Sequence, residues 1–178
     1  MYWKSSGEAH TVATVELALA AAAERGIGHI VVASCSGKTA LLLAGKGLQI
    51  VCVTHANGFT APGCNELPEA TRAALTAEGV AVLTTTHVLS GAERGISRKF
   101  GGVSPVEIIA QTLRMFGQGV KVCVEIAVMA LDAGLIPYGE PIITVAGSGT
   151  GADTALILRP AHAANIFETS IGEIICKP

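Results

Sequence analysis

The amino-acid sequence predicts an α/β fold with three layers, in which a mostly parallel sheet of about five to six strands carries helices on both faces. Short runs of β-branched apolar residues alternate with helical segments along the chain, which is the order of strand–helix–strand units with right-handed crossovers. The runs HIVVA (residues 29–33) and QIVCVT (residues 49–54) are mostly apolar, as strands buried on both faces of a parallel sheet are. Neither a repeat nor a linker interrupts this order, so residues 1–178 are expected to form a single domain.

Caps, glycines and prolines set the expected bounds of the elements in the first half of the chain. Thr11 is predicted to cap a helix that runs to Arg25 and ends at Gly26. Pro68 stands at the expected start of another helix, and Gly79 stands at its end. The expected elements are helices over residues 11–25, 38–44 and 68–78 and strands over residues 29–33, 49–54 and 80–85.

The second half begins with a segment, residues 86–102, that has no periodicity and is expected to be a loop. At roughly 17 residues it exceeds the usual loop length, and long loops in compact domains are more often functional. The run Ser104-Pro105-Val106-Glu107 has the residues of a helix start: a serine cap, a proline in the first helical position and a glutamate in the third. Helices are expected over residues 106–116 and 120–133, and strands over residues 141–146, 154–158 and 173–176.

Composition excludes several classes of protein. Hydrophobic residues make up 50% of the chain and charged residues 15%, which is too apolar for a disordered chain. A net charge of −2 supplies no basic field for a nucleic acid, so no nucleic-acid partner is expected. Charges interrupt every apolar stretch before it reaches the ~20 residues that a bilayer requires, so no membrane association is expected either.

The five cysteines are scattered along the chain, with no CxxC pair and no spacing typical of Cys/His metal ligands. We therefore expect reduced thiols, mostly buried, in a cytoplasmic protein, and we expect no metal site.

The first candidate site residues follow the strand over residues 29–33, at the carboxyl edge where parallel sheets bind ligands. They are Ser34, Cys35, Ser36, Gly37, Lys38 and Thr39. Hydroxyl groups and a glycine before a helix suit a phosphate, although Ser36 acting only as a helix cap is the alternative. The Gly37-Lys38-Thr39 run does not complete a nucleotide-binding P-loop, because position 32 is valine. Cys35 is either a thiol of lowered pKa or a small filler.

Two histidines are expected at the same edge. Thr54 ends the second strand, His55 follows it, and His87 follows the third strand. The histidines either bind a ligand or satisfy loop carbonyl groups. His162, after the fifth strand, is a weaker third candidate.

The loop over residues 90–102 is either a solvated charged loop or a mobile lid whose cations meet an anionic ligand. Its candidate residues are Ser90, Gly91, Arg94, Arg98 and Lys99.

A glycine-rich segment follows the fourth strand. Its candidate residues are Gly147, Ser148, Gly149, Gly151 and Asp153. The spacing is GxGxG and a strand is expected next, so a Rossmann dinucleotide site is not predicted. The glycines permit close approach to a ligand, and Asp153 either binds a ligand hydroxyl or forms a local turn. Glu125 and Asp132 share a helix face, but no histidine or second carboxylate is expected to join them.

These residues resemble a known family. The run IVVASCSGKTALLLAGKGLQIVCVT (residues 30–54) and the run GSGTGADTALIL (residues 147–158) resemble the C-terminal α/β domain of pyruvate kinase. The resemblance is closer to stand-alone proteins like that domain, and it covers nearly the whole chain. It includes HVLSGAERGISRKFGG (residues 87–102), GQGVKVCVEIAVMALDAGLIP (residues 117–137), GADTALILRPAH (residues 151–162) and the EIICKP ending.

The resemblance implies a pyruvate kinase C-terminal domain-like fold and a bound phosphorylated ligand. In pyruvate kinases this domain binds phosphorylated effectors, with the phosphate at the turn that matches Ser34, Ser36, Gly37 and Thr39. The catalytic barrel has no counterpart, so pyruvate kinase activity is not expected. The stand-alone family resembles flavin mononucleotide (FMN) proteins, which makes FMN the expected cofactor. Cys35 and Lys38 depart from the hydroxyl-rich turn of pyruvate kinase and allow a different ligand.

The first functional hypothesis is therefore a binding protein for a phosphorylated cofactor, FMN, and any reaction would be a flavin-dependent redox step. One alternative is a regulatory module that binds a sugar phosphate or a nucleotide. Another is a small phosphatase or transferase with Cys35 as nucleophile. A domain this apolar is also compatible with a small homo-oligomer.

Overall fold

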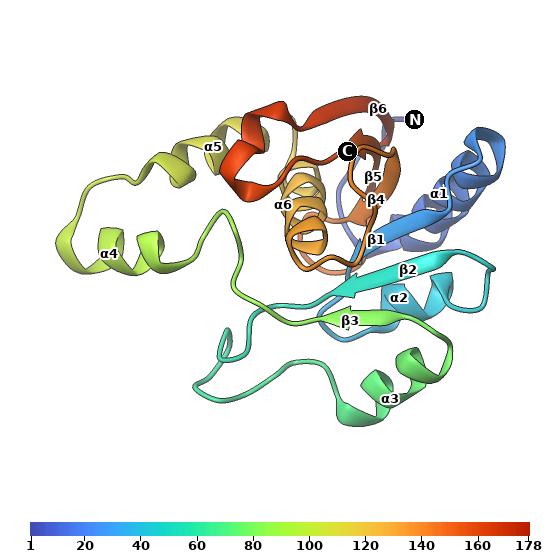
Figure 1. Cartoon of the computed structure of the whole chain (residues 1–178), viewed down its shortest axis with the longest axis horizontal. Helices are drawn as coiled ribbons and strands as arrows, with labels where there is room; N and C mark the ends of the chain where they lie inside the picture. The colour runs from blue at the N-terminus through green and yellow to red at the C-terminus, as the bar shows by residue number, and fades with distance from the viewer.

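In the computed structural model, which describes all 178 residues, six strands form one sheet in the order β3-β2-β1-β4-β5-β6 (Figure 1). The strand β1 pairs in parallel with β2 and β4, and β2 pairs in parallel with β3. The other two pairs, β4–β5 and β5–β6, are antiparallel. The strands are β1 (His29–Ala33), β2 (Gln49–Val53), β3 (Ala81–Leu83), β4 (Ile142–Ala146), β5 (Thr154–Arg159) and β6 (Ser170–Cys176).

Helices cover both faces of this sheet, so the predicted α/β class is confirmed. They are α1 (Thr11–Arg25), α2 (Lys38–Leu43), α3 (Glu69–Ala77), α4 (Ala92–Phe100), α5 (Pro105–Arg114) and α6 (Gln118–Asp132), with short 3-10 helices η1 (Glu8–His10) and η2 (Ala163–Glu168). Side chains of β1 alternate between the two faces. Ile30 and Val32 pack in one buried cluster with α1, α2 and α3, whereas Val31 packs in a second cluster with α6.

Two predicted helix starts can be compared with the observed hydrogen bonds. At the start of α5, the backbone N–H of Ser104 donates to Glu107 Oε2 at 2.8 Å, as the sequence of this segment predicts. Thr11 does not cap α1, because η1 leads directly into the helix and His10 takes the cap position. The Thr11 hydroxyl instead accepts a hydrogen bond from the backbone N–H of Ala152 at 2.9 Å.

The expected loop over residues 86–102 contains the helix α4, so this part of the prediction is wrong. Figure 1 shows α4 on an arm that leaves the sheet after β3 and returns through α5. No residue of α4 is buried, and Ile96 and Phe100 are exposed. No helix of the chain is both long and apolar enough to span a membrane.

The direction of β5 also corrects the prediction for His162. The strands β1, β2, β3 and β4 end at the same edge of the sheet, but β5 runs the opposite way. His162 therefore lies at the other edge, where its Nδ1 is 2.7 Å from Asp132 Oδ1. A histidine does join Asp132, contrary to expectation, and the pair lies away from the carboxyl edge.

Candidate functional site

The carboxyl edge of the parallel strands holds a cleft with two connected hollows. The larger has a volume of about 680 Å³ and lies between the β1–α2 turn and the β4–β5 loop. The smaller has a volume of about 170 Å³ and lies over α6. The two hollows are lined in common by Ala33, Cys35, His55, Gln118 and Val122.

The β1–α2 turn forms one wall of the larger hollow. Ser34, Ser36 and Thr39 line it, and the Ser34 hydroxyl accepts a hydrogen bond from the backbone N–H of Ala40 at 3.4 Å. Gly37, rather than Ser36, occupies the cap position of α2, and it has no side chain with which to cap the helix. The alternative that Ser36 serves only as a cap is therefore wrong, and its exposed side chain lines the hollow.

Gly37 itself is required by the packing of α3. Its φ is +82°, and a Cβ atom would lie 2.4 Å from Thr71 Cγ2 and 2.9 Å from Leu67 Cδ1. Any larger residue would push α3 away from the turn. Neither Gly37 nor Lys38 lines the cleft. Gly37 is buried, and the exposed Lys38 side chain lies outside the two hollows.

The β4–β5 loop forms the opposite wall, to which Gly147, Gly149 and Gly151 contribute. Asp153 is fully buried behind the loop. Its carboxylate accepts hydrogen bonds from the backbone N–H groups of Gly7 and Ser148 and from the Thr154 hydroxyl, at 2.9, 3.2 and 2.7 Å. Asp153 thus ties the loop to the N-terminal segment, and neither it nor Ser148 lines the cleft. A strand follows this loop, as predicted.

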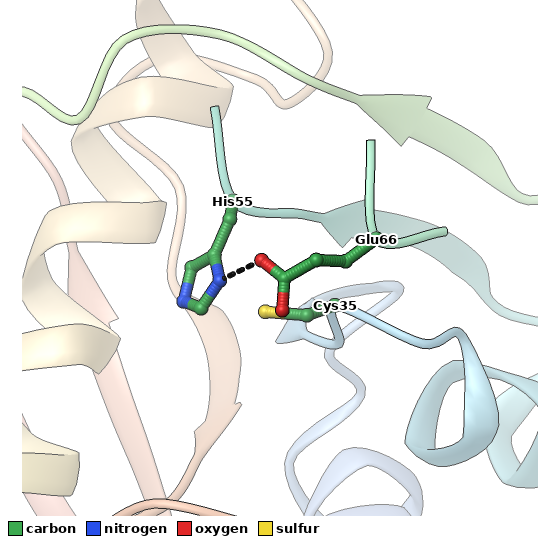
Figure 2. Close-up of side chains that lie close together, drawn as sticks. All are labelled: Cys35, His55 and Glu66. Atoms are coloured by element: carbon green, nitrogen blue, oxygen red, sulfur yellow. Dashed lines mark hydrogen bonds and ion pairs between the residues drawn. The ribbon is translucent and has the colours of Figure 1, made fainter. Parts of the chain in front are cut away.

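Cys35, His55 and Glu66 lie close together (Figure 2), and all three line the larger hollow, whereas only Cys35 and His55 also line the smaller one. His55 Nδ1 lies 2.6 Å from Glu66 Oε2, so this histidine pairs with a carboxylate rather than with a loop carbonyl group. The Phe59 ring stacks on the His55 ring with 3.8 Å between centroids. Glu66 and Phe59 come from the long loop between β2 and α3, in which sequence analysis singled out no site residue after His55.

The Cys35 thiol does not have the lowered pKa considered above. Burial raises its pKa above the ordinary value and outweighs the hydrogen bond from the His55 backbone, which lowers it. Figure 2 also shows the second ring nitrogen of His55 pointing away from the Cys35 sulfur. The structure therefore lacks the nucleophile–base contact that the phosphatase hypothesis requires.

A buried ion pair lies beneath the smaller hollow. Lys121 Nζ donates to Glu125 Oε2 on α6, and each side chain is only 5% exposed. Glu125 Oε1 also accepts the backbone N–H of Leu89 at 3.0 Å, which anchors the start of the arm that carries α4. Burial lowers the pKa of Lys121. A signal for this pair was present, because Gln118, Lys121 and Glu125 recur at helical spacing in an apolar helix.

The remaining predicted residues divide between the hollows and the surface. Thr54, His87, Ser90 and Arg94 line the smaller hollow together with Arg114, which sequence analysis did not single out. Burial lowers the pKa of His87, so this imidazole is held toward its neutral form. Gly91 lines a separate hollow beside the end of α6, and Arg98 and Lys99 lie on the exposed α4. Only the first part of the expected lid therefore reaches the cleft.

Comparison with known proteins gives one family match. The family model described as pyruvate kinase, alpha/beta domain, matches residues 12–158. Among solved structures, pyruvate kinase from Cryptosporidium parvum is similar at 15% identity over 76% of this chain and 20% of that chain, with a TM-score of 0.39. The same enzyme in complex with ADP is similar at 15% identity over 83% of this chain and 22% of that chain, with a TM-score of 0.40. The chain thus spans about a fifth of the length of these pyruvate kinases.

Proposed function

The chain belongs to the pyruvate kinase α/β-domain family, and from this premise we propose that it binds a phosphorylated cofactor, FMN, in the cleft at the carboxyl edge of its sheet. The observation that carries the proposal is the larger hollow, which has hydroxyl side chains on one wall and glycines on the other. Its volume of about 680 Å³ falls within the ~300–1,000 Å³ of small-molecule pockets. The segment that matches is the α/β domain, so the proposal assigns ligand binding to it and not the pyruvate kinase reaction.

The β1–α2 turn supports the phosphate end of this proposal. Ser34, Ser36 and Thr39, which all carry hydroxyl groups, line the larger hollow. Hydroxyl and backbone N–H groups are the usual donors to a phosphate when no bidentate arginine is present. No acidic side chain of the turn itself competes for these donors.

The smaller hollow supports the ring end. Gln118 and Val122 of α6 and the imidazole of His55 line both hollows, so a flat ring that entered from the larger one would meet them. Arg94 and Arg114 would place positive charge near the ring, whereas the charge of Lys121 is offset by Glu125. A bound flavin would supply hydride or electron transfer, and nearby charge tunes its potential.

The same charged lining also favours a second candidate, a regulatory module that binds a sugar phosphate. Lys121, Glu125 and Arg114 line the smaller hollow. These side chains can donate hydrogen bonds to sugar hydroxyls and accept hydrogen bonds from them, whereas the flavin ring has no hydroxyl groups. The two candidates share the phosphate end and differ in the occupant of the smaller hollow.

Replacement of Ser36 by aspartate tests the phosphate end. A carboxylate at this exposed position would repel a phosphate, and we expect FMN affinity, measured by quenching of flavin fluorescence, to fall at least about tenfold. Ser170→Asp is the matched control, because Ser170 is an exposed serine at the opposite edge of the sheet. Equal FMN affinity in the two variants would remove the turn from the proposed site.

A further inference from the structure

Three side chains with metal-binding atoms converge beside the phosphate-facing turn. The Cys35 sulfur, a His55 ring nitrogen and a Glu66 carboxylate oxygen all lie within 4.8 Å of one another. Figure 2 shows the three side chains pointing toward a common centre from separate segments of the chain. Cys35 follows β1, His55 follows β2, and Glu66 lies in the loop before α3, so their separation in the sequence hides the cluster.

From this convergence we propose that Cys35, His55 and Glu66 bind one Zn²⁺ ion, whose open coordination position faces the cleft. One sulfur, one nitrogen and one oxygen are a donor set that zinc accepts, and sites with three protein ligands leave a fourth position for water or substrate. All three residues line the larger hollow, so the fourth position opens into it.

The distances permit such a site after one local change. Metal–ligand bonds of about 2.0–2.3 Å in a tetrahedron place neighbouring ligand atoms about 3.5 Å apart. His55 Nδ1 and Glu66 Oε2 are 2.6 Å apart, so the ion would replace this hydrogen bond. Rotation of the Glu66 carboxylate would move Oε2 away from His55 Nδ1 and keep one carboxylate oxygen at the cluster.

The surroundings favour binding at these three residues. Phe59 stacks on His55 at 3.8 Å and holds the ring in the orientation in which Nδ1 faces the cluster. The side chains of His55 and Glu66 are 34% and 30% exposed, so an ion can enter from solvent without unfolding the loop. A bound Zn²⁺ would attract an anionic oxygen into the cleft or lower the pKa of a bound water.

This inference stands apart from the flavin proposal, because the phosphate donors Ser36 and Thr39 are not among the ligands. Metal binding is measured by Co²⁺ titration and flavin binding by quenching of FMN fluorescence, both on the whole chain. Failure of one proposal can therefore be distinguished from failure of the other.

The test is titration of the chelator-treated full-length protein with Co²⁺, followed by competition with Zn²⁺. We expect one Co²⁺ per chain, a thiolate-to-metal charge-transfer band in the near ultraviolet, and loss of that band when Zn²⁺ is added. Cys35→Ser should abolish the band, and His55→Gln and Glu66→Gln should each weaken Co²⁺ affinity at least about tenfold.

Two matched controls separate this site from other thiols and histidines. Cys64→Ser removes the exposed cysteine, and His162→Gln removes the other histidine–carboxylate pair, which has no cysteine beside it. Both variants should keep the wild-type spectrum and stoichiometry. Absence of Co²⁺ binding by the wild type, or a charge-transfer band that survives in Cys35→Ser, would overturn the proposal.

Discussion

At the scale of single residues, the surroundings of a side chain decide its chemistry more than its type does. Cys35 and Cys64 are both accessible to some degree, but Cys35 lies in the cleft and Cys64 lies in an exposed loop. Burial raises the pKa of the Cys35 thiol. Since the thiolate is the reactive form, Cys35 has less of it at neutral pH than an ordinary cysteine has.

We therefore expect iodoacetamide to modify Cys35 more slowly than Cys64 at pH 7 in the presence of a chelator. The Cys35 rate should keep rising with pH above the pKa of an ordinary thiol, because its own pKa lies higher. Peptide mass spectrometry at several pH values measures both rates in one sample. Faster modification of Cys35 at neutral pH would restore the hypothesis of a nucleophilic thiol.

The residues of the cleft show what sequence reasoning can and cannot find. Ser34, His55 and Gly147 could be predicted, because each lies within two residues of the end of a recognisable parallel strand. Glu66 and Arg114 could not, because tertiary packing alone brings the loop before α3 and the end of α5 to the cleft. Asp153 was assigned to the cleft by its position, and its burial behind the loop depends on a contact with Gly7, 146 residues earlier in the chain.

At the scale of elements, α6 contributes both to the core and to the cleft. Its apolar side chains pack on the sheet, whereas Lys121 and Glu125 form the buried ion pair under the smaller hollow. Glu125 also holds the backbone of Leu89, so a single carboxylate connects the helix to the arm that carries α4.

Replacement of one residue of the Lys121–Glu125 pair should destabilise the protein. We expect Glu125→Ala to lower the free energy of unfolding by about 3–5 kcal/mol, because Lys121 would be left buried without its partner. The double variant Lys121→Met/Glu125→Leu should recover much of the loss, because it leaves no buried charge. Urea denaturation measures both. A loss below about 0.5 kcal/mol in Glu125→Ala, as for a surface substitution, would contradict the burial of the pair.

Two helical glycines provide a second test at this scale. A Cβ at Gly119 in α6 would lie 2.1 Å from Thr154 Oγ1, whereas a Cβ at Gly95 in α4 would meet nothing within 4 Å. Gly119→Ala should therefore destabilise the protein by about 1–3 kcal/mol through overpacking against β5. Gly95→Ala should be neutral or stabilise it by up to about 1 kcal/mol through helix propensity. Thermal denaturation compares the two, and the same effect in both would contradict the close contact of α6 with β5.

The helix α4 marks the limit of prediction at the scale of elements. The bounds of α1, β1, β2 and α6 could be predicted to within two residues, because caps, glycines and apolar runs identify them. A signal for α4 was present, because Ala92, Ile96 and Phe100 recur at helical spacing among charged residues. The structure leaves this apolar stripe exposed, and no residue of the helix is buried, so the segment resembles a charged loop more than a core helix.

At the scale of the whole molecule, the cleft results from strand direction. The parallel strands β1, β2, β3 and β4 bring their following loops to one edge. The strand β5 runs the opposite way and starts at that edge, so the glycine-rich loop between β4 and β5 lies there. The expected homo-oligomer stays a prediction, and the exposed Ile96, Phe100 and Met115 on and near the arm are where self-association would be sought.

The measurement that tests the flavin proposal most directly is the visible absorbance spectrum of the freshly purified protein, before and after addition of FMN. The proposal predicts flavin bands in the protein as isolated, or bands that shift and saturate at one FMN per chain on titration. A spectrum without flavin bands, together with FMN bands that do not change in the presence of the protein, would contradict it.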